Sequence, residues 1–428
     1  MSRSGGSRLS QRTEMAALLA IGVSATTWTQ LRVPGMPFGP GETLLMAWLA
    51  WRIAVLSYWP QGFRVDGLTK GVLSYWLVTL TLGALGTTWF IAQRFDLPFG
   101  FQHTAPALLF IVVLSALVAQ SFASERAVDT LGKVLLVTAA GLPAVLLLFS
   151  FVEPSPLGLS LKYGGLRFSG LAENPNQVAL SVVPLPFLAA QLARDAGSFR
   201  QRLLFRLLGA CAVAVGVATL SDALILAWAC AFALLGGIGA WRLVVTRYAS
   251  PARWAVLLIV VPLGIVLGLA YVAPYLYDNL ERYAAEVYEE GGQGSFRLIL
   301  WRNGLEAALR SPWFGFGPGA HSGIDGPFQG WEVHNSYIDW ATITGLSGLL
   351  ILLLFMAWPL WTCAHARKHW LIGGLVAVMV FSIFHFVLRH PSLWVFLIWA
   401  VAYCRTRGFS GAAGRWPVQS EHLRRAAG

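Results

Sequence analysis

The sequence predicts an all-α polytopic membrane protein, on the basis of its composition, the length of its apolar runs and the placement of its charges. Of 428 residues, 56% are hydrophobic and 12% are charged, and the mean hydropathy is +0.62. Soluble domains carry about 25% charged residues. Since no block of soluble composition is long enough for a domain, we expect residues 1–428 to form a single integral membrane domain.

The apolar runs set the expected number of helices. A bilayer core about 30 Å thick requires about 20 mostly apolar residues per helix, which predicts about 12 spans with a large loop between the ninth and the tenth. The second run contains Arg52, and only the region around Ser221 and Asp222 interrupts the seventh and eighth. The spans are expected near residues 15–31, 42–58, 70–92, 104–122, 131–151, 175–193, 203–220, 223–243, 254–276, 335–361, 371–388 and 391–404.

The basic residues predict the orientation of these spans. With the amino terminus in the cytoplasm, roughly two thirds of the 31 Lys and Arg residues fall in cytoplasmic segments, as the positive-inside rule requires. This places both termini in the cytoplasm, makes 405–428 a basic cytoplasmic tail, and puts the loops near 152–174 and 277–333 on the outer side. A basic start before an apolar run also resembles a signal peptide. Because further spans follow at once, we expect a retained first span.

Composition also excludes several classes of protein. The net charge of +11 is spread between apolar runs, which argues against a nucleic-acid-binding face. The four cysteines lie in or beside apolar runs without CxxC spacing, so neither a disulfide framework nor a zinc site is indicated. No two aspartates form a D-x-D pair of the kind that holds a hard cation.

The stretch from Gly294 to Leu349 concentrates charge and backbone freedom ahead of a span. We expect a helix capped by Ser295 and running through Leu309, ended by Pro312. His334 then stands at the mouth of the next span, and histidine is the usual general base at neutral pH. The alternative is an interfacial helix anchored by tryptophans, with solvated arginines and a hydrogen-bonded histidine.

The motifs in this stretch resemble those of the O-antigen ligase/polymerase family, whose members are bacterial inner-membrane enzymes that use glycans carried on undecaprenyl diphosphate. A second loop, from Leu166 to Leu180, resembles another pattern of the same family. The residues that carry the resemblance are Arg297, Trp301, Ser311-Pro312, Gly315-Phe316-Gly317, His334-Asn335-Ser336-Tyr337 and Gly345 to Leu349, and in the second loop Arg167 and Asn174-Pro175-Asn176.

The resemblance implies a GT-C-like fold, a periplasmic active site within 277–333, and a role in lipopolysaccharide or surface polysaccharide biosynthesis. It makes His334 the base that activates an acceptor hydroxyl and Arg297 a ligand of the donor diphosphate, in an inverting reaction that needs no metal and no cofactor. The acceptor is lipid A–core for a ligase or another lipid-linked glycan for a polymerase, and the partners are membrane lipids rather than nucleic acid. Substrate-binding roles fall to Arg167, Arg302, Asn174, Asn176, Asp222, Gly315, Gly317, His321, Tyr337 and Arg389.

One residue departs from the family pattern. The family usually has an arginine where Asp222 stands, and a carboxylate cannot replace a guanidinium that binds diphosphate. Either Arg302 or Arg389 supplies that charge, or Asp222 orients another group; the plainer alternative is a turn residue that caps the eighth span. Likewise, Asn174 is equally well read as a helix cap before Pro175.

Other histidines and other classes of protein remain as alternatives. His365 and His369 fit a solvated interfacial cluster, whereas His385 and His390 are weaker candidates for lining the same cavity as His334. A transporter or flippase would place ionisable groups near the membrane midplane along a two-sided path, and a non-catalytic scaffold would leave the two outer loops apart. The sequence does not distinguish a ligase from a polymerase, and it gives neither the sugar nor the oligomeric state.

Overall fold

The computed structural model describes residues 4–58, 65–245 and 293–407, apart from the single positions 37, 95, 99, 123, 324, 326 and 327. The expected ninth span at 254–276, the first part of the long loop and residues 408–428 of the expected tail lie outside the described residues.

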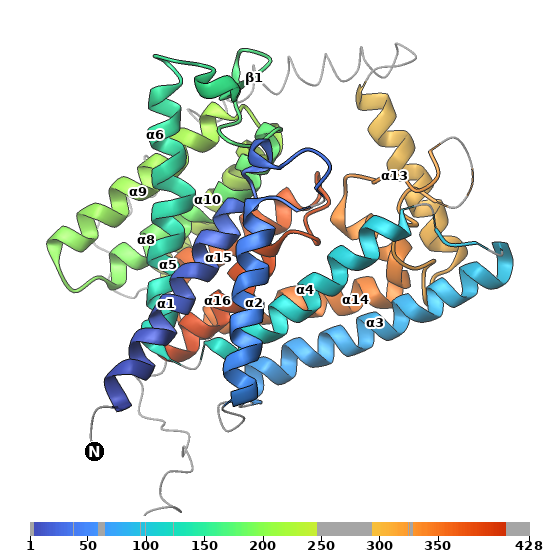
Figure 1. Ribbon diagram of the computed structural model, residues 1–428, viewed down its shortest axis with the longest axis horizontal. Coiled ribbons are helices and arrows are strands. Elements are labelled where there is room, and N and C mark those ends of the chain that lie inside the picture. Colours follow the sequence, from blue (N-terminus) through green and yellow to red (C-terminus); the bar gives the residue numbers. More distant parts are fainter. Residues whose placement is uncertain are drawn as a thin grey trace, which may run out of the picture.

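The described chain is almost entirely helical, which confirms the all-α class (Figure 1). Each expected span that falls on described residues coincides with a helix or a pair of helices, and seven helices are long and apolar enough to cross a membrane. The elements are α1 Ser4–Ala25, α2 Pro40–Tyr58, α3 Gly67–Arg94, α4 Phe101–Ser121, α5 Glu125–Leu136, a π-turn Val137–Gly141, α6 Leu142–Phe149, β1 Lys162–Tyr163, β2 Arg167–Phe168, α7 Pro175–Val182, α8 Leu185–Asp195, α9 Phe199–Ala218, α10 Asp222–Val245, α13 Gln293–Arg310, α14 Ser336–His365, α15 His369–Phe381 and α16 Pro391–Arg407.

Two expected boundaries are wrong. Helix α13 begins at Gln293, so Ser295 lies inside the helix rather than capping it. Helix α15 ends at Phe381 rather than near 388. The reason is that the N-terminus of α14 engages the following residues: Ser336 N donates to the carbonyl of Ser382, and Ser336 Oγ donates to the carbonyl of His385. Residues 382–390 therefore form a loop that reaches the start of α14.

The helices converge on an aromatic core built around α14. Trp76 of α3 lies 4.6 Å from Trp394 of α16 and 6.3 Å from Trp340 of α14, measured between ring centroids. The indole N–H of Trp76 donates to Ser115 Oγ at 2.7 Å, and that of Trp394 donates to the carbonyl of Leu388 at 2.7 Å. In Figure 1 the N-terminus lies at the lower left, and the β1 hairpin and α13 lie away from it, toward the upper edge.

Helix α14 is broken at Gly345, whose φ of 76° is in the left-handed region. The segment 312–317, which follows α13, satisfies the backbone groups freed by the break. Phe316 N donates to the carbonyl of Thr342 at 2.8 Å, Gly317 N donates to that of Ile343 at 3.0 Å, and Leu346 N donates to that of Pro312 at 2.7 Å. Close approach of two backbones requires glycine, and Cβ atoms added at Gly315 or Gly345 would collide with the opposite chain. This exchange of hydrogen bonds fixes the loop between α13 and α14 to the core.

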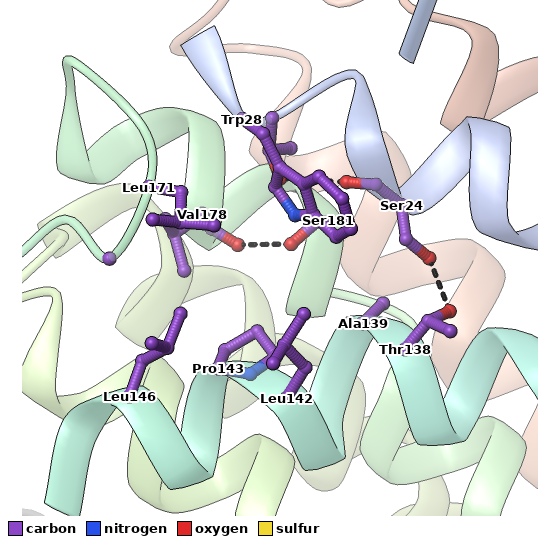
Figure 2. Close-up of a pocket in the computed structure, with 12 residues that line it drawn as sticks. Ser24, Trp28, Thr138, Ala139, Leu142, Pro143, Leu146, Leu171, Val178 and Ser181 are labelled. Atoms are coloured by element: carbon purple, nitrogen blue, oxygen red, sulfur yellow. Dashed lines mark hydrogen bonds between the residues drawn. The ribbon is translucent and has the colours of Figure 1, made fainter. Parts of the chain in front are cut away.

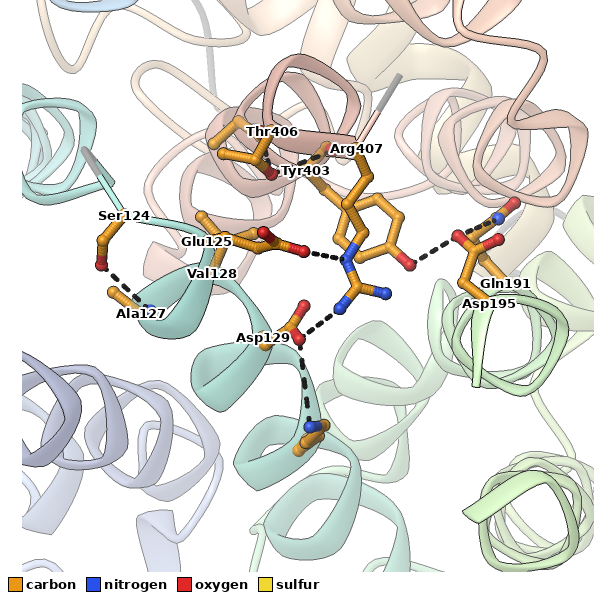
Figure 3. Close-up of polar contacts among 12 residues, drawn as sticks. Ser124, Glu125, Ala127, Val128, Asp129, Gln191, Asp195, Tyr403, Thr406 and Arg407 are labelled. Atoms are coloured by element: carbon orange, nitrogen blue, oxygen red, sulfur yellow. Dashed lines mark hydrogen bonds and ion pairs between the residues drawn. The ribbon is translucent and has the colours of Figure 1, made fainter. Parts of the chain in front are cut away.

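A polar network joins the helices α5, α8 and α16 (Figure 3). Asp195 at the end of α8 accepts hydrogen bonds from Tyr403 Oη at 2.7 Å and Lys368 Nζ at 2.8 Å. Arg407, at the end of α16, binds Glu125 at 3.1 Å and also Asp129, both on α5. These contacts tie α5, α8 and α16 to the residue that precedes α15.

Replacement of Gly317 by Ala should destabilise the protein. Gly317 has a φ of +84° and packs against Thr87 of α3 so closely that a methyl group would overlap its side chain. Strain and overlap together should cost about 2 kcal/mol or more, seen as a lower apparent Tm in detergent by intrinsic fluorescence. Gly236→Ala in α10, where no atom lies within 4 Å of the added carbon, is the matched control. Equal melting of both variants would contradict the packing role.

Tyr403→Phe should also lower the apparent Tm, because it removes the hydroxyl that binds the Asp195 carboxylate. Hydrogen bonds to charged groups contribute about 1.5–3 kcal/mol, and Lys368 remains, so we expect a loss of about 1–2 kcal/mol. Tyr58→Phe, at a side chain that is 80% exposed, should leave the Tm unchanged. A wild-type Tm for Tyr403→Phe would show that the network adds no stability.

Candidate active site

The β1–β2 hairpin presents Arg167 to the turn between α9 and α10. Arg167 Nε donates to the carbonyl of Thr219 at 3.0 Å, and its Nη2 donates to Asn176 Oδ1 at 3.2 Å. Asn176 stands in the first turn of α7, which Asn174 caps by accepting from Asn176 N at 2.8 Å, with Pro175 at the first helical position. The expected cap at Asn174 is therefore confirmed, and the start of α7 orients the arginine.

The α1–α2 connection holds this hairpin in place. Gln30 Nε2 donates to the carbonyls of Ser160 at 2.7 Å, Gly170 at 3.1 Å and Ala172 at 2.8 Å, which closes the loop around the two strands. The side-chain amide of Gln30 thus contacts three carbonyl groups of a loop that is distant in the sequence.

Helix α13 carries Arg297 and is anchored on both sides of it. Phe296 packs edge-on against Phe328 at 4.9 Å and Trp331 at 5.7 Å, between ring centroids. One helical turn further on, Trp301 lies 6.4 Å from Phe384 in the loop between α15 and α16. Within the described part of the chain, Arg297 forms no ion pair, so its charge is available to an anionic ligand.

His334 projects from the residues that lead into α14. Its φ of 58° is in the left-handed region, which is uncommon for a residue other than glycine. The next residue, Asn335, caps α14 by accepting from Tyr337 N at 3.0 Å and Ile338 N at 3.2 Å. The helix therefore starts directly after the histidine, and the His334 side chain remains exposed.

The electrostatic environment of His334 favours the neutral imidazole. Partial desolvation of the imidazole lowers the pKa of His334 below its ordinary value of 6.5. The carboxylate of Glu332 opposes this shift, whereas the guanidinium groups of Arg297 and Arg389 add to it. A neutral imidazole at pH 7 has a lone pair with which to accept a proton.

His385 is the functional candidate that sequence reasoning undervalued. It lies in the 382–390 loop, stacks on Phe381 at 4.6 Å between ring centroids, and is only partly exposed. Burial lowers the pKa of His385 to about 3, and the charges of Arg297, His334 and Arg167 act in the same direction. The two arginines come from segments 130 residues apart, and both lie near enough to lower the pKa of this one imidazole. The signal in the sequence was the occurrence of His385, Arg389 and His390 shortly before Pro391.

Arg389 lies at the edge of this cluster. It forms an ion pair with Glu332 and also lies 5.7 Å from the ring of Phe386. Burial and the neighbouring Arg389 lower the pKa of His390 to about 4. The Arg389–Glu332 pair links the 382–390 loop to the residues just before His334.

Several expected site residues have other surroundings. Arg302 faces outward, with a side chain that is 81% exposed and paired with Glu306 at 2.9 Å. The hydroxyl of Tyr337 donates to the carbonyl of Met379 at 2.9 Å, and Gly315 and Gly317 pack on neighbouring helices rather than on open space. His321 is buried, with its Nδ1 on Asp339. Asp222 is the first residue of α10, three residues after the carbonyl that Arg167 binds.

A small cavity lies between residues of α1, α6 and α7 (Figure 2). The space open to the centre of a water molecule is about 20 Å³, lined by hydroxyls such as Ser24, Thr138 and Ser181 and by apolar side chains of α6. Such a volume accommodates about one water. None of the expected site residues lines it.

The fold defines an all-α polytopic membrane protein, and this cluster is a basic, histidine-bearing candidate site. Residues 207–353 match the family model described as O-Antigen ligase, which supports the assignment to the O-antigen ligase/polymerase family. The family supports an enzyme acting on glycans in a bacterial membrane, with lipid-linked glycan substrates and a role in surface polysaccharide biosynthesis. No curated protein matches the chain significantly.

The charges around His334 predict how its pKa responds to substitution. Arg297→Gln removes a cation and should raise the pKa of His334, whereas Glu332→Gln removes an anion and should lower it, each by up to about one unit. The pH dependence of carbethoxylation at His334, followed by mass spectrometry, measures both. Arg302→Gln, on the outward face of the same helix, should change nothing. Equal values in all three variants would place Arg297 away from His334.

Proposed function

We propose that this protein transfers a glycan from undecaprenyl diphosphate to an acceptor hydroxyl, on the periplasmic side of a bacterial inner membrane, with both termini in the cytoplasm. The observation that carries the proposal is that Arg297 acts on both His334 and His385, and that Arg167, from a distant segment, also acts on His385. Two guanidinium groups beside a neutral histidine suit a reaction in which a diphosphate leaves and a hydroxyl loses its proton.

In the proposed mechanism His334 accepts the proton of the acceptor hydroxyl as its oxygen attacks the anomeric carbon. The bond from that carbon to the diphosphate oxygen breaks, and undecaprenyl diphosphate leaves with the bonding electrons. Attack from the face opposite the leaving group inverts the anomeric centre. Arg297 and Arg167 stabilise the charge that develops on the diphosphate, through charge-assisted hydrogen bonds. These guanidinium groups make a metal ion unnecessary for that task.

Arg167 offers a solution to the departure at Asp222. Its guanidinium binds the carbonyl of Thr219 at 3.0 Å, in the same turn where the family usually has an arginine. We propose that Arg167 supplies the missing positive charge there. Arg302 is less suited because its side chain is 81% exposed and paired with Glu306, and Arg389 is paired with Glu332.

A carrier of a lipid-linked or anionic substrate is less well supported. His334 lies outside the helices that meet the criteria for a membrane span, as does Arg297, whereas a two-sided path needs polar groups near mid-membrane. Arg52, inside α2, has its guanidinium on Gln120 of α4. The charged groups of the proposed site thus lie outside the candidate spans rather than along them.

Replacing His334 with Ala should reduce glycan transfer by at least about 10²-fold, the usual contribution of a positioned base. Purified protein in proteoliposomes, supplied with a lipid-linked oligosaccharide and either lipid A–core or a second lipid-linked glycan, would give the rate and the acceptor from a gel ladder. His365→Ala, at an exposed histidine at the far end of α14, should leave transfer unchanged.

Donor binding separates the two roles. His334→Ala should still bind the donor, whereas Arg297→Ala and Arg167→Ala should bind it more weakly, since each removes a charge-assisted contact. Full transfer activity in His334→Ala would remove the assignment of the base.

A further inference from the structure

The residues next to His334 hold its backbone in a left-handed conformation. Its φ of 58° belongs to a region that costs of the order of 1 kcal/mol for a residue other than glycine. Such a conformation persists only where the surrounding structure constrains it. The residues on both sides of His334 supply that constraint, since Val333 and Asn335 are buried while the His334 side chain is exposed.

One carboxylate binds the backbone on both sides of His334. Asp339, in the first turn of α14, accepts a hydrogen bond from Val333 N at 3.0 Å on Oδ1 and from Asn335 N at 3.3 Å on Oδ2. The side chain of Asp339 is fully buried. The two oxygens therefore bracket the histidine and leave its imidazole as the part of the segment that points away from the core.

A buried histidine orients this carboxylate in turn. His321 Nδ1 lies 2.8 Å from Asp339 Oδ1, and its Nε2 lies 3.2 Å from Thr104 Oγ1 of α4. Because the carboxylate receives two backbone N–H groups, it acts as an acceptor, which assigns the proton of the His321 contact to Nδ1. The ring also packs edge-on against Phe386 at 5.2 Å between centroids. His321 thus has both nitrogens engaged and lies away from the exposed site.

We propose that Asp339, oriented by His321, is a positioning residue that holds the catalytic histidine in register with Arg297 and His385. The inference rests on the proposed function, because it assigns a purpose to the geometry of His334. It also gives His321 a role behind the site instead of the substrate-binding role expected from the motif. The contacts join Thr104 of α4, His321 of the 315–323 loop and Asp339 of α14. Three separate segments therefore determine the position of His334.

The contact between Asp339 and His321 matters for the geometry of the site more than for the stability of the protein. A buried pair is a weak source of stability, because desolvation offsets most of the attraction. Its effect on geometry is larger, since a shift of about 1 Å in a reacting group lowers turnover by about 10²-fold. Loss of Asp339 should therefore change turnover far more than it changes substrate binding.

The test compares Asp339→Asn with wild type in two measurements. An amide side chain retains one acceptor oxygen but turns an NH₂ group toward the second backbone N–H, so one of the two hydrogen bonds next to His334 is lost. Hydrogen exchange of the peptide around 331–336 should become at least about tenfold faster, and kcat should fall by about 10–100-fold with KM changed less than about threefold. Asp325→Asn removes an exposed carboxylate of the same loop, bound to Arg94 and Arg310, and should leave both measurements at wild-type values.

A second pair of variants covers the case in which Asp339→Asn fails to fold. His321→Gln keeps an N–H donor for Asp339 and should retain at least about tenfold more activity than His321→Leu, which keeps none. Equal activity of these two variants, or wild-type exchange and kcat in Asp339→Asn, would overturn the positioning role. His334→Ala decides the underlying function separately: if it remains active, the proposed base is wrong, while the exchange data still report whether Asp339 holds the segment.

Discussion

A helix that breaks within a membrane protein frees backbone groups that lipid cannot satisfy, and this requirement shapes the centre of the molecule. Helix α14 breaks at Gly345, and the segment 312–317 supplies the missing partners, with Phe316 N on Thr342 O at 2.8 Å and Leu346 N on Pro312 O at 2.7 Å. The connection between α13 and α14 therefore packs as part of the core. Because its start is fixed in this way, the rest of the connection brings His321 and His334 to defined places.

The site combines two opposite electrostatic conditions. Its histidines are kept neutral by burial and by neighbouring cations, so that the pKa of His385 falls to about 3 and that of His334 falls below 6.5. Its arginines keep their charge, and within the described residues neither Arg297 nor Arg167 has a carboxylate partner. Neutral bases beside cations that have no carboxylate partner suit a reaction between an anionic donor and a neutral hydroxyl nucleophile.

Much of this arrangement was predictable because it depends on local patterns. Apolar run lengths gave the helices, Pro312 gave the end of the α13 region, and Asn174 before Pro175 gave the cap of α7. The extent of α15 was not predictable, because it depends on hydrogen bonds between residues 382–387 and Ser336, which is distant in the sequence. His385 was only a weaker candidate in the sequence for the same reason: the charges that act on it, Arg167, Arg297 and His334, come from segments that no sequence interval joins.

The sequence by itself determined which segments lie in the membrane and which residue types are available outside it, because hydropathy and charge act residue by residue. Only the tertiary structure decided which of those residues meet. Arg297 and Arg302 lie about 140° apart around one helix, and packing of Phe296 and Trp301 on other segments turns the first toward His334 while the second pairs with Glu306. Likewise, the sequence marks Asp339 only as a residue near the start of a helix. In the folded protein its two oxygens accept hydrogen bonds from Val333 N and Asn335 N, the backbone groups on either side of His334.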